Sequence, residues 1–290
     1  SCPICNSSDS THEIWSDNVH GRHQVNPRGK FELRRCRECQ GLYIKDLKIN
    51  SDYYKKYYKL GYYDSSVSRS GSFLNRILDF TSFCSTKLKQ HYIQAYFPKN
   101  KKLDILDVGC GNGKFLSLLT SSKFNKTGQD INPEGCRSCA KKGINVYCNN
   151  LENIDFKDQK FEVITLWNVL EHIDKPIKTL RTIHQILKPK GILVIQVPNT
   201  DSIGYQFGKN DWFHLDSPRH IVNYNTSSLK YLCDSSGYRI IDTKNEFYDY
   251  PLDLFWSVRN NKLKPFIYIL YPILKIFSRD QLSYICQKIN

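Results

Sequence analysis

Apolar and polar positions follow two periods along most of this chain. Short apolar runs predict buried strands near residues 104–108, 126–130, 144–148, 161–166 and 191–198. The segments between and after them have apolar residues three and four apart, which predicts helices near 113–121, 133–142, 174–187 and 226–236. Strands that alternate with helices in this way predict an α/β fold with a doubly wound sheet.

Segments outside this region have a different pattern. Residues 72–97 form an amphipathic helical stretch that Pro98 ends. Before it, tyrosines crowd residues 50–71 at spacings of three and four, which suits either a helical linker or a lid over a binding site. We expect a helical tail after residue 250, where the run 265–277 is strongly apolar and flanked by basic residues. This run is too short to span a bilayer, but it suits an interfacial helix, a cap over a pocket or a dimer contact.

The composition limits the class of protein. With 290 residues, 40% of them hydrophobic and 24% charged, the chain is long enough for one good core and a smaller module. The formal net charge of +14 favours anionic partners, such as nucleic acid, phosphorylated sugars or anionic lipid, without selecting among them. The chain has 11 cysteines and its first residues do not read as a secretory signal. We therefore expect reduced thiols and a cytoplasmic protein, with peripheral membrane contact as an alternative.

The glycine-rich turn after the first predicted core strand carries the main chemical signal. Residues 107–113 read Asp-Val-Gly-Cys-Gly-Asn-Gly, between an apolar strand and the start of a helix. Such a strand–turn–helix unit lets a nucleotide lie against bare backbone at the carboxyl edge of the sheet. A dinucleotide fingerprint needs its third glycine at position 114, which is lysine here. The carboxylate of Asp107 also suits a cationic ligand better than a pyrophosphate.

This turn resembles the first motif of class I S-adenosylmethionine-dependent methyltransferases. Four more segments fall in the order that this family has, so the resemblance covers roughly residues 100–248: Thr127–Asp130, Asn149–Glu152, Phe161–His172 and Leu187–Pro198. The resemblance implies a Rossmann-like sheet, with residues 238–248 as its last, antiparallel strands, and S-adenosylmethionine as the cofactor. The cofactor-binding residues that it implies are Asp107, Gly109, Cys110, Gly111, Gly113, Asp130, Ile131, Asn150, Leu151, Trp167 and Asn168.

The resemblance also gives several of these residues a role. Gly109 and Gly111 would admit the methionine part of the cofactor, and Asp107 would attract its ammonium or sulfonium charge. Asp130 would accept hydrogen bonds from the ribose, at the spacing expected after the first glycine. Asn150 and the residue after it would border the adenine, where the family often has an acid.

A methyl acceptor that is a hydroxyl benefits from a base, and histidine titrates in the useful range. Two histidines are candidates: His172 ends the fourth-strand motif, and His220 lies in the loop that follows the fifth strand. We favour His220 as the base and assign Arg219 to an anionic part of the substrate. The alternative is that either histidine only completes a local hydrogen-bond network.

The segment around the first of these histidines has a second resemblance. Asn168, Glu171 and His172 partly resemble the acid-x-x-Glu-His cluster of ubiquinone-type O-methyltransferases, in which the group can hold a divalent metal. Asparagine in the first place removes one charge, so magnesium is an alternative that we do not favour. The segment also departs from the Asn/Asp-Pro-Pro-aromatic signature of methyltransferases that act on exocyclic amines of bases.

Cysteine spacing supplies another strong pattern. Two Cys-x-x-Cys knuckles, about 30 residues apart, are typical of a tetrahedral thiolate zinc site formed by Cys2, Cys5, Cys36 and Cys39. Four thiolates leave no open coordination position, so we expect a structural zinc. We expect the histidines of the long spacer at the surface. The cysteine pair on the second core helix has no such partners, and we expect it, like Cys110, to pack in the interior.

These predictions divide the chain into a zinc-ribbon-like module (1–48), a helical linker or lid (49–100), a cofactor-binding methyltransferase domain (101–250) and a helical tail (251–290). The loop before His220, and an N-terminal module of this kind, are similar to those of methyltransferases in bacterial glycan and secondary-metabolite pathways. We therefore expect O-methylation of a small molecule, such as a sugar, a nucleotide-sugar or a glycan precursor, which the tail would let the enzyme reach in lipid-linked form.

Two other functions stay open. An RNA methyltransferase would use the zinc module and the basic charge to grip the phosphate backbone. It should gather Arg34, Arg35 and Arg37 beside the mouth of the pocket. A non-catalytic scaffold would bind S-adenosylmethionine without turnover, and replacing His220 would then change nothing.

Overall fold

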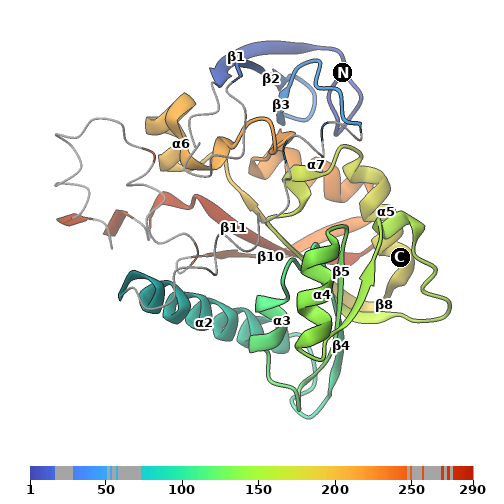
Figure 1. Ribbon diagram of the computed structural model, residues 1–290. Coiled ribbons are helices and arrows are strands. Elements are labelled where there is room, and N and C mark those ends of the chain that lie inside the picture. The colour runs from blue at the N-terminus through green and yellow to red at the C-terminus, as the bar shows by residue number, and fades with distance from the viewer. Residues whose placement is uncertain are drawn as a thin grey trace.

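The computed structural model describes residues 1–16, 29–50, 73–246 and 277–289, together with Tyr53, Tyr57, Asp249, Ser257, 269–270 and 273–274. These residues form two β-sheets, and helices surround the larger one (Figure 1). Most of the tyrosine-rich segment and most of the expected helical tail lie outside the described residues, so the choice between linker and lid stays a prediction.

The larger sheet has seven strands in the order β10–β11–β8–β7–β4–β5–β6. Five of them are parallel, at the positions that the apolar runs predict: β4 (Leu103–Val108), β5 (Phe124–Asp130), β6 (Asn145–Cys148), β7 (Phe161–Trp167) and β8 (Leu187–Pro198). The other two are β10 (Tyr238–Asn245) and β11 (Gln281–Lys288). The predicted doubly wound α/β sheet is confirmed.

The prediction was wrong at one edge of this sheet. Strand β11 pairs antiparallel with both β8 and β10, so β10 runs in the same direction as the five parallel strands and β11 opposes them. Residues 281–288 belong to the segment 251–290, which we expected to be helical. The physical reason is burial: the side chains from Gln281 to Cys286 are all buried, so they need the two-sided environment that only an inner strand provides.

Five helices lie where the three- and four-residue spacing predicts, and several are shorter than expected: α2 (Phe73–Gln94), α3 (Lys114–Leu118), α4 (Pro133–Lys141), α5 (Pro176–Ile186) and α7 (Thr226–Ser235). The short helix α6 (Ile203–Gly208) was not predicted. Short 3₁₀ turns follow several strands: η1 (Leu151–Asn153), η2 (Leu170–His172), η3 (Lys209–Asp211) and η4 (Phe213–Leu215). Among the helices in the described ranges, none is long and apolar enough to cross a bilayer.

Alternate residues of the central strands fill two cores, one on each face of the sheet. Leu106 and Ile164 point into a core that α5 and α7 cover, with Ile183 and Leu229 among its members. Their chain neighbours point into the opposite core, which includes buried residues of α2, α3 and α4. This is the layering of a doubly wound fold, and it places the ends of β4, β5 and β7 at one carboxyl edge.

The second sheet ties the N-terminal residues to the rest of the chain. It consists of β1 (Ser10–Ser16), β2 (Phe31–Cys36), β3 (Leu42–Ile44) and β9 (Val222–Asn223), in that order. In Figure 1 this sheet, mainly blue, lies at the top, above the orange helix α7. Because β9 comes from the segment that we assigned to the methyltransferase domain, residues 1–48 do not complete their own sheet.

Candidate active site at the carboxyl edge of the sheet

The glycine turn follows β4 directly and has an unusual backbone. Gly109, Gly111 and Gly113 have positive φ angles of 68°, 55° and 73°. A Cβ atom at Gly109 would lie 2.5 Å from Cγ2 of Val169, so conformation and space both exclude a side chain there. The turn therefore presents bare backbone at the edge of the sheet, as the sequence predicts.

Side chains at the end of β5 hold this turn in place. The Gly111 N–H donates to Oδ2 of Asp130 at 2.7 Å, and the Gly109 N–H donates to Oε1 of Gln129 at 3.3 Å. Oδ1 of Asp130 also accepts from the Asn132 N–H at 2.8 Å, where α4 begins. The carboxylate assigned to the ribose thus also braces the turn. Sequence reasoning missed Gln129, because a buried polar residue within a strand gives no periodic signal.

Asp107 is buried beneath the turn. Its Oδ1 accepts a hydrogen bond from the Thr165 hydroxyl at 2.7 Å, across the β4–β7 pairing. Burial raises the pKa of Asp107 to about 7, although the Thr165 hydrogen bond and the positive charge of Lys89 act in the opposite direction. A cationic ligand beside this carboxyl group would favour its ionised form, so the site suits a positively charged group.

Polar atoms beyond the end of β7 lack partners. Trp167 Nε1 and Asn168 Oδ1 are buried, and neither makes a hydrogen bond to any residue that the structure describes. The Lys89 ammonium lies 4.2 Å from the centroid of the Trp167 ring and 2.7 Å from Oδ2 of Asp249. A bound ligand, an ion or a water molecule can satisfy buried polar atoms of this kind. Together with Asp107 and the bare turn, the residues present fit S-adenosylmethionine.

Three residues of the expected cofactor-binding set follow the ends of β5 and β6. Ile131 is 50% exposed and Asn150 is also exposed, whereas Leu151 is buried in the core. An exposed isoleucine next to Asp130 offers an apolar surface for a flat base.

Cys110 serves as a small interior residue, in line with the prediction. Its Sγ lies 3.7 Å from that of Cys139, whose Sγ lies 3.4 Å from the Gly111 carbonyl oxygen. The hydrogen bond with Cys139, together with burial, raises the pKa of the Cys110 thiol. A thiol that stays protonated is a poor nucleophile.

The two candidate histidines lie against each other. The ring centroids of His172 and His220 are 4.8 Å apart, edge to face. Nδ1 of His172 lies 2.9 Å from the Arg219 carbonyl oxygen, and Nδ1 of His220 lies 2.7 Å from that of His214. A carbonyl oxygen only accepts, so each Nδ1 carries a hydrogen and each Nε2 carries a lone pair.

Carboxylates face these imidazoles. Nε2 of His220 is 3.9 Å from Oε1 of Glu171 and 4.0 Å from Oδ2 of Asp216. Asp216, which sequence reasoning missed because it lies in an irregular loop, forms an ion pair of 2.5 Å with Arg219. The residue assigned to an anionic part of the substrate is thus already paired.

Burial sets the protonation of this cluster. It raises the pKa of Glu171 to about 8, and it lowers the pKa of His172 to about 4 and that of His220 to about 3. Both imidazoles are therefore neutral at pH 7. A base with so low a pKa takes a proton from a hydroxyl poorly on its own, so His220 is a weaker candidate than its position in the sequence suggests.

Two aromatic residues near this loop have structural roles. Trp212 is fully buried and donates from Nε1 to Oδ1 of Asp280 at 2.8 Å. Tyr205 is also buried, and its hydroxyl donates to Oε1 of Glu13 at 3.0 Å. Of the tyrosine-rich segment, Tyr53 donates to the Pro218 carbonyl oxygen at 3.1 Å, which places it beside the loop that carries Arg219 and His220.

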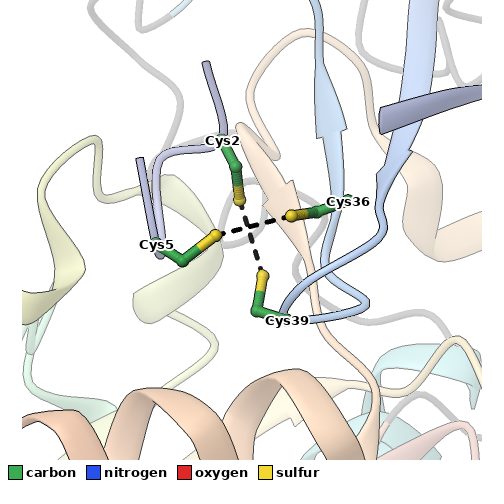
Figure 2. A group of neighbouring side chains, drawn as sticks. All are labelled: Cys2, Cys5, Cys36 and Cys39. Carbon is green, nitrogen blue, oxygen red and sulfur yellow. Dashed lines mark hydrogen bonds between the residues drawn. The ribbon is translucent and has the colours of Figure 1, made fainter. Parts of the chain in front are cut away.

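The four N-terminal cysteines converge on one point (Figure 2). The sulfur atoms of Cys2 and Cys39 are 3.5 Å apart, those of Cys5 and Cys36 are 3.4 Å apart, and all four lie within 4.8 Å of one another. A tetrahedral zinc ion with Zn–S bonds of ~2.3 Å separates its sulfurs by about 3.8 Å. The donor set and its geometry therefore fit zinc. His12 is not part of this group; its ring is exposed beside Glu32.

The order of the strands, the glycine turn and the orphaned polar atoms define the class of protein as a class I methyltransferase. A family model described as a methyltransferase domain matches residues 80–243, and the chain belongs to this family.

The chain is also similar in sequence and in fold to individual known proteins. The chain is 32% identical over 142 residues to an uncharacterized protein of Methanocaldococcus jannaschii, covering 49% of this chain and 61% of that protein. It is 31% identical over 169 residues to a ubiquinone biosynthesis O-methyltransferase of Rickettsia typhi, covering 55% of this chain and 65% of that one. The matches thus span less than two thirds of both relatives. Among solved structures, the plantazolicin methyltransferase BpumL, in complex with a substrate analog and SAH, shares the fold with a TM-score of 0.52 and 21% identity, over 74% of this chain and 87% of BpumL.

Proposed function

We propose that the protein transfers a methyl group from S-adenosylmethionine to a hydroxyl oxygen of a small molecule, such as a sugar, a nucleotide-sugar or a glycan precursor. The observation that carries this proposal is the set of unpartnered polar atoms beside Asp107 and the glycine turn. The bound cofactor supplies an activated methyl group, so the residues of the chain have to bind it, align the acceptor and exclude water.

Two observations support oxygen as the atom that accepts the methyl group. The relative from Rickettsia typhi is named as an O-methyltransferase. In this chain, Glu171 and His172 lie in η2 just after β7, and His220 joins them from the loop before β9. The cluster offers lone pairs to the proton of a hydroxyl. We assign proton removal to this cluster as a whole, and we assign Arg219, which pairs with Asp216, to the support of the loop that carries His220.

The basic residues of the N-terminal sheet do not favour the RNA alternative. Arg34 pairs with Glu32, Arg35 with Glu13, and Arg37 with Asp9. Each guanidinium thus lies beside a carboxylate of the N-terminal segment, which weakens its attraction for a phosphate backbone.

We propose further that the cysteine cluster holds a structural zinc ion and that the tail contacts lipid. Four thiolates complete a tetrahedral shell and leave no position for a substrate, so the ion would act on folding only. In the tail, Ile269, Ile273 and Phe277 are exposed, which suits an interfacial position near a lipid-linked substrate.

Calorimetry and a methyl-transfer assay test the proposed function. The full chain should bind S-adenosylmethionine and SAH, and it should release SAH with at least one member of a panel of sugars and nucleotide-sugars. If the protein methylated RNA and none of these small molecules, the methyl acceptor would be RNA. If the protein bound S-adenosylmethionine but methylated no acceptor, and His220→Gln left this binding unchanged, the protein would be a non-catalytic scaffold.

The affinity for S-adenosylmethionine should rise with pH. The pKa of Asp107 is raised to about 7, so this carboxyl group must lose its proton before its negative charge can attract a cationic ligand. Between pH 6 and pH 8 we expect affinity to increase about tenfold, since the ionised fraction rises by about that factor. Titrations at both pH values measure this, and Asp107→Asn should remove the dependence.

The matched control is Asp104→Asn on the same strand. The Asp104 carboxylate pairs with Lys188 at 2.9 Å, away from the turn, and its loss should leave the pH profile unchanged. A profile that persists in the Asp107 variant would assign the effect to another group.

A further inference from the structure

Gln196, near the end of β8, has an amide oxygen without a hydrogen-bond donor. The residue is fully buried, and its Oε1 accepts no hydrogen bond from any residue that the structure describes. Its Nε2, in contrast, donates to Oδ2 of Asp249 at 2.6 Å, which fixes the orientation of the amide. A buried carbonyl oxygen without a donor is costly, so a bound molecule has to supply the donor.

The strand order places this amide on the side of the sheet that the cofactor leaves open. Strand β7 separates β8 from β4, and Gln196 lies opposite Trp167 in the β7–β8 pairing. The methionine part of the cofactor belongs at the turn after β4, and its ribose belongs at Asp130 after β5. The ends of β7 and β8 thus remain for the methyl acceptor, at the same carboxyl edge.

An ion pair from two distant segments lies beside the amide. The Lys89 ammonium on α2 is 2.7 Å from the same Oδ2 of Asp249 that Gln196 contacts, so ammonium and amide are neighbours. Ser85, one turn earlier on α2, donates to Oδ1 of Asp249 at 2.6 Å. Although burial raises the pKa of Asp249, the charge of Lys89 and these hydrogen bonds lower it below its usual value, so this carboxylate is ionised.

The ammonium has donors to spare. Among the described residues, Nζ of Lys89 makes one hydrogen bond, to Asp249, and it lies 4.2 Å from the centroid of the Trp167 ring. An ammonium has three N–H groups, so others remain for a ligand. One unsatisfied acceptor and at least one unused donor therefore lie side by side.

Charge and hydrogen-bonding capacity together indicate an uncharged hydroxyl group. The charges of Lys89 and Asp249 cancel, so a phosphate or a carboxylate would meet a carboxylate as well as the ammonium and gain little. A hydroxyl both donates one hydrogen and accepts through its lone pairs. An apolar group would leave the amide oxygen of Gln196 unsatisfied.

We propose that Gln196 and Lys89 bind an uncharged hydroxyl group of the methyl acceptor, and that Asp249 holds both side chains in place. The hydroxyl donates to Oε1 of Gln196 and accepts from Nζ of Lys89. This inference rests on the proposed function and deepens it.

The hydroxyl bound here is for recognition and does not receive the methyl group. A glutamine amide is no base, and the carboxylate of Asp249 already accepts from three donors. A second oxygen of the same molecule therefore has to face the methyl group. The subsite thus favours acceptors with several hydroxyl groups over those with one.

Myo-inositol is the probe for this subsite, because its rigid ring carries uncharged hydroxyl groups on every carbon. Saturation-transfer NMR on the full chain loaded with SAH should show saturable binding. Gln196→Met keeps the length of the side chain and removes the amide, so it should weaken binding about tenfold, the effect of one lost hydrogen bond. Gln196→Asn withdraws the oxygen by one methylene group and should weaken binding to a similar extent. Both variants should keep their SAH affinity within about a factor of two, which also shows that they fold.

Ser283→Ala is the matched control. Ser283 lies opposite Gln196 in the β8–β11 pairing and is equally buried, and its hydroxyl donates to Oε1 of Glu246. The change therefore removes a buried polar group from the same face of the sheet without touching the unsatisfied oxygen. This variant should bind myo-inositol like the unchanged chain.

Equal binding of myo-inositol by the Gln196 and Ser283 variants would overturn the inference, as would no saturable signal from an unchanged chain that binds SAH. Inorganic phosphate is the second probe: if it displaced myo-inositol at millimolar concentration, the subsite would bind anions and the assignment to a hydroxyl would be wrong. Failure to bind SAH would instead contradict the proposed function, so the two failures are distinguishable.

Discussion

Replacement of Gly109 by alanine should lower the affinity for SAH about 100-fold. The residue has a φ of +68°, which costs an alanine about 1–2 kcal/mol. The new Cβ would also lie 2.5 Å from Cγ2 of Val169, and such overpacking costs about 1–3 kcal/mol more. The turn that faces the cofactor has to shift to relieve this strain. A combined cost near 3 kcal/mol corresponds to about two orders of magnitude in affinity. Isothermal titration calorimetry with SAH measures it.

Gly143→Ala separates conformation from space. Gly143 has nearly the same φ, +70°, yet no atom of the described residues lies within 4 Å of its added Cβ. This variant should lose about 1–2 kcal/mol of stability and keep its SAH affinity within about a factor of two. Adding Val169→Ala to Gly109→Ala should recover roughly tenfold in affinity, because it removes the clash and leaves the strain. Wild-type affinity in Gly109→Ala alone would contradict the placement of the cofactor on this turn.

Replacement of Cys36 by serine should remove the metal and destabilise the whole protein. Three of the four cysteines are buried, and Cys36 ends β2 in a core that also contains Tyr224 and Leu229 of the methyltransferase region. We expect the zinc content to fall well below one ion per chain. The free energy of unfolding should fall by on the order of 5 kcal/mol, a part of the ~10–16 kcal/mol with which structural zinc binds. Elemental analysis and denaturant titration give the two values.

Cys148→Ser is the control for this change. Cys148 is exposed at the end of β6, so its replacement should alter neither zinc content nor stability. If Cys36→Ser kept both the metal and its stability, the converging sulfurs would not be a zinc site.

The sequence was sufficient for features that depend on short-range pattern. The five parallel strands, the glycine turn and the burial of Cys110 follow from local periodicity and from the spacing of glycines. Pairing over long distances was not predictable in this way. Strand β11 reads as an ordinary polar and apolar mixture, Gln-Leu-Ser-Tyr-Ile-Cys-Gln-Lys, and only its neighbours β8 and β10 make it an inner strand.

The same limit applies to the site. Asp107 and Asp130 were found because they stand at fixed distances from the glycine turn. Lys89 and Asp249 were not, because they reach the edge from a helix before the first core strand and from a segment after the last parallel one. The role of Glu171 likewise depends on His220, which arrives through the β3–β9 pairing and not through any local motif.

That pairing also limits how the chain can be divided. Leu42 and Tyr43 lie opposite Asn223 and Val222, and the Ile44 N–H donates to the Ile221 carbonyl oxygen at 3.2 Å. A shortened protein that starts after residue 48 would leave β9 with a bare edge and uncover the apolar side of α7, which are conditions for self-association. The N-terminal segment and the catalytic segment are therefore expected to be inherited, exchanged and expressed as one unit.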